Sequence, residues 1–140
     1  MLPWLAVVAL LTVASGCYWL RYHDLLETHL GLMQGLANDA AEAIAAGDGL
    51  LQASDIERLR YPLDRARQFV AVSRRRSSQR ASLERFESFV AAYAELVDEL
   101  DRARVAPPTP QVLAVTDRQV ARIDVLAGSV RDAIATERAD

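Results

Sequence analysis

The sequence has no lysine, since all 16 of its basic residues are arginine. A generic surface would accept either side chain, so we take this bias as a mark of a GC-rich genome without functional meaning. The single cysteine excludes an internal disulfide framework and any cysteine-based metal cage. The net charge of -3 lacks the positive field that phosphate binding requires, so we also exclude a nucleic-acid partner.

Signatures of catalysis are absent too. The chain has no glycine-rich phosphate loop, no His-Glu-x-x-His and no Gly-x-Ser-x-Gly. Its two histidines, His23 and His29, are six residues apart and would lie on different faces of a helix. The Glu-x-x-His pairs of helical di-iron proteins do not occur either. We therefore expect a protein that is not an enzyme and that binds no metal or other cofactor.

The first twenty residues contain no charged side chain. Nineteen helical residues from Leu2 to Leu20 would span about 28 Å, close to the hydrocarbon core of a bilayer. Aromatic residues stand where the two headgroup layers would be, namely Trp4 at one end and Tyr18, Trp19 and Tyr22 at the other. We predict a single-pass membrane anchor over residues 1–21, with membrane lipid as its first partner.

A second interpretation of the anchor rests on Cys17. The tetrapeptide that ends there, residues 14–17, resembles the lipobox of bacterial lipoproteins. The resemblance implies lipidation of Cys17, removal of residues 1–16 and an outer-membrane location. The uncleaved helix is favoured because no basic residue precedes the apolar run, which also continues to Leu20. Under both interpretations we expect the rest of the chain on the periplasmic, outer face of a bacterial inner or outer membrane.

Beyond the anchor, apolar residues recur at helical spacing in four stretches, and no alternation typical of β-strands is found. We expect helices over residues 22–46, 54–75, 78–104 and 110–137. Their apolar stripes are, in order, Leu25, Leu26, Met33, Leu36, Ala40 and Ile44; Ile56, Leu59, Leu63, Ala66 and Val70; Leu83, Phe86, Val90, Tyr93, Val97 and Leu100; Leu113, Thr116, Val120, Ile123, Ala127, Val130 and Ile134. Residues 22–140 are thus predicted to form an all-α, up-down antiparallel four-helix bundle. A homo-oligomer that uses the same stripes stays open.

Several residues indicate where these helices begin, end or bend. Gly47 and Gly49 suit the end of the first helix. Ser54 and Glu57 have the spacing of a capping box, and Pro62 predicts a kink or a restart within the second helix. Thr109 is expected to cap the fourth helix.

Gly31 and Gly35 are four residues apart on the first expected helix. Each costs about 1 kcal/mol relative to alanine in a helix interior, so a close contact should offset the cost. We favour packing on a neighbouring helix inside the bundle. The alternative is a face for a partner protein.

Arg74, Arg75, Arg76 and Arg80 form the one basic cluster of the chain. They suit the negative end of the second helix's dipole and a solvated turn. In an up-down bundle this turn would also return to the membrane, where each arginine could gain about 1 kcal/mol from anionic headgroups. The sequence therefore predicts a lipid-headgroup contact at these four residues.

The first functional hypothesis is a non-enzymatic accessory or scaffold protein that docks on another envelope or membrane-complex protein. A sensory or ligand-binding module is the main alternative, because chemoreceptor-type periplasmic domains are also tethered four-helix bundles. Such a receptor would need a second membrane helix and a signalling output, which the sequence does not show. A phage spanin-like lysis protein is a third hypothesis.

Overall fold

Helices make up nearly all of the part of the chain that the structure, a computed structural model, describes. This part comprises residues 2–46, 51–76, 80–104 and 108–140, with side chains from Arg21 onward. The helices are α1 (Leu2–Ala45), α2 (Ala53–Arg76), α3 (Ala81–Ala103) and α4 (Pro110–Ala139). These described residues contain no strand, so the predicted all-α class is confirmed.

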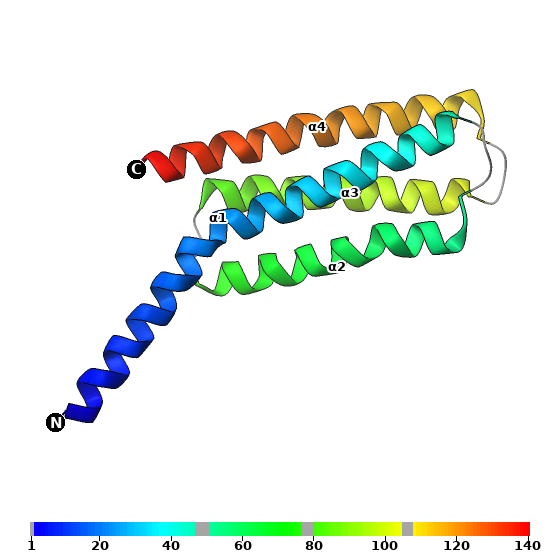
Figure 1. Cartoon of the computed structure of the whole chain (residues 1–140). Coiled ribbons are helices and arrows are strands. Elements are labelled where there is room, and N and C mark those ends of the chain that lie inside the picture. Colours follow the sequence, from blue (N-terminus) through cyan, green and yellow to red (C-terminus); the bar gives the residue numbers. More distant parts are fainter. Residues whose placement is uncertain (1, 47–50, 77–79, 105–107) are drawn as a thin grey trace.

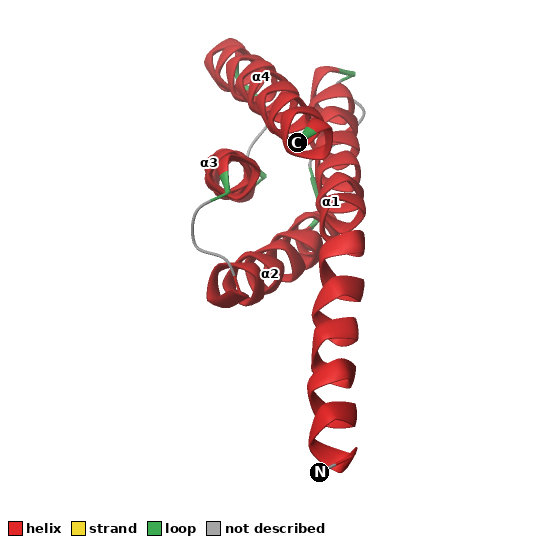
Figure 2. Ribbon diagram, turned by 90° about the vertical axis from the view of Figure 1, so that its left-hand side faces the viewer, coloured by secondary structure: helices red, strands yellow, loops and turns green. Residues whose placement is uncertain are grey.

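The four helices run alternately up and down (Figure 1). α3 packs most extensively on α4 and then on α2, while α1 packs on α4 and less closely on α2. Neighbours along the chain are therefore neighbours in space, and α4 closes the ring on α1. Figure 2 shows this arrangement from a second side. The structure agrees with the predicted four-helix bundle.

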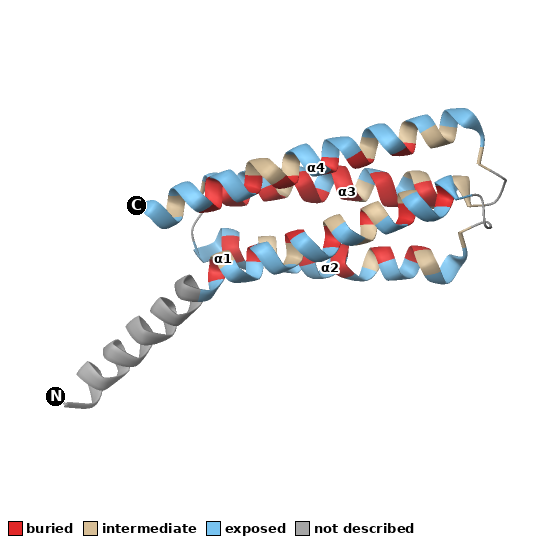
Figure 3. Cartoon of the chain, turned by 45° about the horizontal axis from the view of Figure 1, so that its top comes forward, coloured by how far each residue is buried: buried red, intermediate tan, exposed pale blue. Residues whose placement is uncertain are grey.

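The core lies where the apolar stripes of the four helices meet (Figure 3). The predicted stripe of α3 is buried along its whole length, and in the α4 stripe only Leu113 remains partly exposed. One stripe residue of α1 is placed differently, because Leu25 is 41% exposed and the buried positions are Tyr22, Leu26 and Leu30. The core side of α1 is thus turned away from Leu25.

The cap of α2 differs from the prediction. The helix begins at Ala53, so Ser54 and Glu57 already lie inside it. Asp55 accepts a hydrogen bond from the backbone N–H of Gln52 at 2.8 Å, which is the reciprocal half of a capping box shifted by two residues. The predicted cap of α4 is present, since the hydroxyl oxygen of Thr109 accepts from the N–H of Val112 at 3.2 Å.

α2 continues through Pro62 as one helix, so the predicted restart does not occur. Pro62 has no N–H to give to the carbonyl of Arg58. One residue further on, the carbonyl of Leu59 accepts a hydrogen bond at 2.8 Å from the buried hydroxyl of Tyr93 on α3. Burial raises the pKa of Tyr93 well above its usual range, so this hydroxyl stays protonated and donates. The α2 turn next to the proline is therefore tied to α3.

Four of the predicted anchor residues, Trp4, Cys17, Tyr18 and Trp19, lie outside the side chains that the structure describes, and the glycines expected to end α1, Gly47 and Gly49, lie outside the described residues. Among the helices as described, none has a stretch that is long and apolar enough to cross a membrane.

Candidate interaction surfaces

Tyr22 lies in the core at one end of the bundle. We call this end, which holds Tyr22, Ser82 and Glu137, the base. The Tyr22 side chain is fully buried, its ring stacks on Phe69 of α2 at 5.8 Å between centroids, and its hydroxyl lies 3.0 Å from Oγ of Ser82 on α3. The sequence predicts that Tyr22 belongs to an aromatic belt at the membrane surface, whereas in the structure its side chain joins α1 to α2 and α3.

Glu137 near the end of α4 caps the beginning of α3. Arg80 occupies the N-cap position of α3 and makes no side-chain cap bond there. Glu137 replaces that cap, because its Oε1 accepts from the Ser82 hydroxyl at 2.8 Å and its Oε2 from the Ser82 N–H at 3.3 Å. A carboxylate is also favoured by the positive end of the helix dipole. The first turn of α3 is thus stabilised from another helix.

A second polar contact joins α4 to α1 at the base. Arg138 donates to Asp24 at 2.6 Å and to Glu27 at 3.3 Å. These exposed ion pairs are each worth little, but they lie beside the partly buried Glu137 contacts. Neither Glu137 nor Arg138 was predicted as a functional residue, because charged residues near a helix end look like a solvated tail in the sequence. The sequence offered one signal for such a contact, namely Arg80 at the start of α3, because arginine is not a helix-capping residue.

His23 lies next to the Glu137 cap without joining its hydrogen bonds. Its Nε2 is 3.8 Å from Oε1 of Glu137 and has no hydrogen-bond partner among the described residues. Burial lowers the pKa of His23, and the nearby Arg80 and Arg138 lower it further, against the opposing effect of Glu137. The Ser82 hydroxyl donates to Glu137 and not to His23.

His29 is placed on α1 near the bundle's aromatic side chains. Its ring lies 5.1 Å from the ring of Phe69 and 6.4 Å from that of Phe86. Burial, followed by the charge of Arg65, lowers the pKa of His29. Within the described parts of the chain, no group of three or more histidine, cysteine or carboxylate side chains could hold a metal ion.

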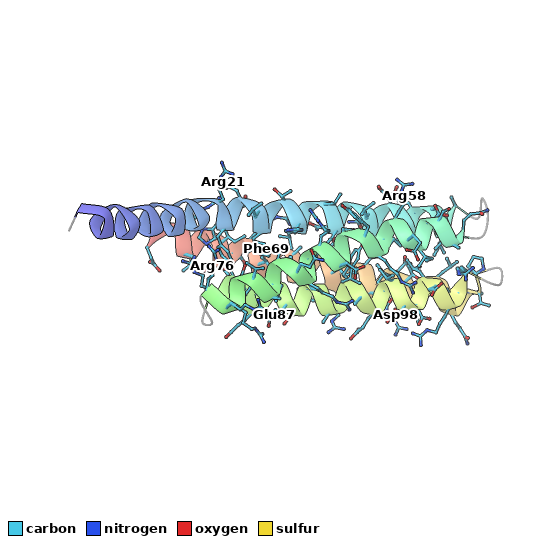
Figure 4. All side chains as sticks on the ribbon, turned by 90° about the horizontal axis from the view of Figure 1, so that it is seen from below. Arg21, Arg58, Phe69, Arg76, Glu87 and Asp98 are labelled. Carbon is cyan, nitrogen blue, oxygen red and sulfur yellow. The ribbon has the colours of Figure 1, made fainter. Side chains whose placement is uncertain are left out.

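The predicted basic cluster lies at the base, but its four arginines differ in surroundings. Arg74 is paired with Glu87, while Arg80 lies 5.0 Å over the Tyr22 ring and 3.9 Å from Glu137. Arg75 and Arg76 are exposed. Figure 4 shows Arg76 at the same end of the bundle as Arg21, where α1 continues into residues 2–20. The end of α2 and the start of α3 therefore lie at the end of the bundle from which the predicted anchor extends.

Gly31 and Gly35 lie on the exposed side of α1. A Cβ atom added at either position would meet no atom within 4 Å. The favoured prediction, close packing of this pair on another helix of the bundle, is therefore not what the structure shows. The use of the two glycines as a face for a partner stays a prediction.

A shallow apolar groove runs between α1 and α2. It consists of two adjoining hollows, which share Leu36 and Arg58. The hollow nearer the base has a volume of about 440 Å³ and is lined by Leu32, Leu36, Glu57, Arg58, Tyr61 and Pro62. The hollow farther from it has a volume of about 270 Å³ and is lined by Leu36, Asp39, Ala40, Ala43, Leu51, Asp55, Arg58 and Leu59. We call these residues the α1–α2 groove.

No protein-family model matches the chain, and neither a curated protein nor a solved structure is similar to it.

Proposed function

We propose that the protein is a non-enzymatic accessory protein, in which a membrane anchor at residues 1–21 holds the helical bundle at the membrane and the bundle docks on another envelope or membrane-complex protein. The observation that carries this proposal is the position of the basic cluster. Arg80 at the start of α3 lies over the Tyr22 ring, and Arg76 at the end of α2 lies at the same end of the bundle (Figure 4), where α1 leads toward the uncharged residues 2–20.

The chemistry of the base supports a structural role for its polar side chains. Ser82 and Glu137 are hydrogen-bonded to each other, and Arg80 is held by both Glu137 and the Tyr22 ring. These contacts join α1, α3 and α4 at the end nearest the predicted anchor. Arg75 and Arg76 lie at this end and are exposed, as a contact with lipid headgroups would require.

The anchor is tested by intact-mass measurement on protein purified from native membranes, combined with protease digestion of spheroplasts. We expect a full-length mass and cleavage of the bundle from outside. A mass that begins at a lipidated Cys17 would replace the transmembrane anchor by a lipoprotein. Protection from protease would contradict the periplasmic location, and recovery of the protein only in the soluble fraction would overturn the proposal.

The headgroup contact is tested by thermal unfolding of the full-length chain in nanodiscs, followed by circular dichroism. If each headgroup contact is worth about 1 kcal/mol, replacing phosphatidylcholine by phosphatidylglycerol should raise Tm by roughly 5 °C at low salt. The double variant Arg75→Gln/Arg76→Gln should lose this rise. The control Arg102→Gln/Arg118→Gln, which removes the same charge from exposed positions away from the base, should keep it. An equal rise in both variants would exclude the contact.

A further inference from the structure

We infer that His23, Ser82 and Glu137 form an acid-sensitive latch at the base, in which protonation of His23 draws the Glu137 carboxylate away from Ser82 and loosens the start of α3 and the end of α4. The latch joins α1, α3 and α4. It goes beyond the proposed function and does not depend on it, because all three residues belong to the bundle.

His23 lies at the base with one ring nitrogen shielded from water. Only 13% of its side chain is exposed, and its buried Nε2 is 3.8 Å from Oε1 of Glu137, which is too far for a hydrogen bond. A buried polar atom without a hydrogen bond is rare in folded proteins and calls for a physical reason. Among the described side chains, Glu137 provides the carboxylate at salt-bridge distance from this nitrogen. A proton on Nε2 would therefore need Glu137 to move closer.

Glu137 is already engaged with α3. Its Oε1 accepts from the Ser82 hydroxyl at 2.8 Å, and its Oε2 accepts from the Ser82 N–H at 3.3 Å. The second distance lies just beyond the usual range for N–H···O bonds, so a small shift of the carboxylate breaks it. Ser82 offers neutral donors, whereas a protonated His23 adds the attraction between opposite charges. His23 and Ser82 thus compete for the same carboxylate once His23 is charged.

Charged groups surround His23 from more than one helix. The ionisable groups recorded with His23 or with its direct neighbours are Tyr22, Asp24 and Glu27 on α1, Arg80 at the start of α3, and Glu137 and Arg138 on α4. From α2, the uncharged ring of Phe69 stacks on Tyr22. Asp24 and Glu27 are hydrogen-bonded to Arg138, so Glu137 is the carboxylate that balances His23 and Arg80.

This environment determines the direction of the response to acid. Burial lowers the pKa of His23, Glu137 raises it in part, and Arg80 and Arg138 lower it again. When the latch opens, the ring meets water and takes up a proton near its ordinary pKa of 6.5. The opened form therefore gains population as the pH falls through 6.5. At pH 5.5, one unit below that value, the gain is at most about tenfold.

The latch is tested by hydrogen–deuterium exchange of the full-length chain in phosphatidylcholine nanodiscs at about pH 7.5 and about pH 5.5. Mass spectrometry follows residues 82–86 and 133–139 at the base and residues 92–97 in the middle of the bundle. Protection factors correct for the slower chemical exchange at the lower pH. We expect the protection of the two base segments to fall roughly threefold to tenfold at the lower pH.

Two variants assign this fall to one histidine. His23→Gln takes up no proton and should abolish the fall at the base. His29→Gln is the matched control, because it makes the same substitution on the same helix at another histidine with a lowered pKa, and it should leave the fall at the base intact. In the middle of the bundle, where exchange needs global unfolding, each variant should remove only part of the response to pH. Circular dichroism spectra identical to those of the original chain would show that each variant folds.

The inference is overturned if the base segments keep their protection at the lower pH, if the fall persists in His23→Gln, or if His29→Gln abolishes it. It is also overturned if the base and the middle have the same protection and change alike, since the base would then open only with the whole bundle. That comparison within the original chain decides even if His23→Gln does not fold. Loss of the headgroup contact in the membrane experiments would leave the latch unaffected.

Discussion

At the scale of single residues, the bundle is stabilised by a few polar side chains that satisfy groups on other helices. Glu137 caps α3 from α4, and Tyr93 of α3 donates to a backbone carbonyl of α2. Both contacts occur where a local rule of helix formation is broken, at an arginine N-cap and beside an internal proline. The Glu137 contact thus replaces the missing cap of α3, while the Tyr93 contact joins α2 to α3 one residue beyond the carbonyl that Pro62 leaves unpaired, and removal of either should be costly.

Glu137→Ala should lower the free energy of unfolding by about 1–3 kcal/mol, because Ser82 would lose the acceptor for both its hydroxyl and its N–H. Chemical denaturation followed by circular dichroism measures the loss. Glu137→Gln, which keeps an acceptor oxygen, should recover part of it. The control is Asp132→Asn at an exposed position of α4, for which we expect no change. A loss as large in the control would mean that general charge, and not the cap, is responsible.

Tyr93→Phe should cost about 1 kcal/mol of unfolding free energy, since the buried hydrogen bond from its hydroxyl to the carbonyl of Leu59 would be lost. Tyr61→Phe removes a hydroxyl from a side chain that is 66% exposed and should have no measurable effect. Both values come from the same denaturation experiment. If the two variants were equally stable, the Tyr93 hydroxyl would contribute nothing to the α2 turn at Pro62.

At the scale of elements, α1 differs from the other helices because its sides serve different purposes. Buried residues such as Leu26 and Met33 face the core, and Gln34 donates to Asp124 of α4 at 2.8 Å. The side toward α2 is packed less closely and holds the apolar groove. The remaining side carries Gly31 and Gly35 in open space. The face with Gly31 and Gly35 is the one that the sequence offers for a partner protein.

Gly31→Ala and Gly35→Ala should each stabilise the bundle by about 1 kcal/mol, because alanine is the better helix former and its methyl group meets no neighbour. The converse change Ala43→Gly, at an exposed position of the same helix, should destabilise by a similar amount. Thermal unfolding of the three variants measures these differences. Destabilisation by either alanine would show that the glycines are in contact within the bundle after all.

At the scale of the whole molecule, the base is the region where all the parts of the bundle meet. It contains Tyr22 of α1, the end of α2, Ser82 of α3 and Glu137 of α4. His23 lies beside this cluster with a lowered pKa, and His29 lies deeper along α1 with a lowered pKa as well. The stability of the bundle should therefore depend on pH in the range in which histidines titrate.

Both histidines take up protons less readily in the folded chain than in the unfolded chain, where the pKa is 6.5. The unfolded chain is therefore favoured as the pH falls through 6.5 toward the lowered pKa of the folded state, and stability is regained at higher pH. We expect a smaller free energy of unfolding at about pH 5.5 than at about pH 7.5. Carboxylates contribute little to the change in stability between these two pH values. The double variant His23→Gln/His29→Gln should flatten this dependence. An unchanged slope would assign it to other groups.

The sequence by itself determined the elements of this protein, because the apolar stripes of α3 and α4 record at every turn which side is buried. Thr109 likewise marks its helix start through a contact three residues away. The tertiary structure alone decided the rest. Whether Tyr22 meets lipid or Ser82, and whether Glu137 is a tail residue or a cap, depends on a residue 60 or 55 positions away, respectively. Whether Gly31 meets a neighbouring helix or open space depends on how the helices pack. No local spacing in the sequence encodes these contacts.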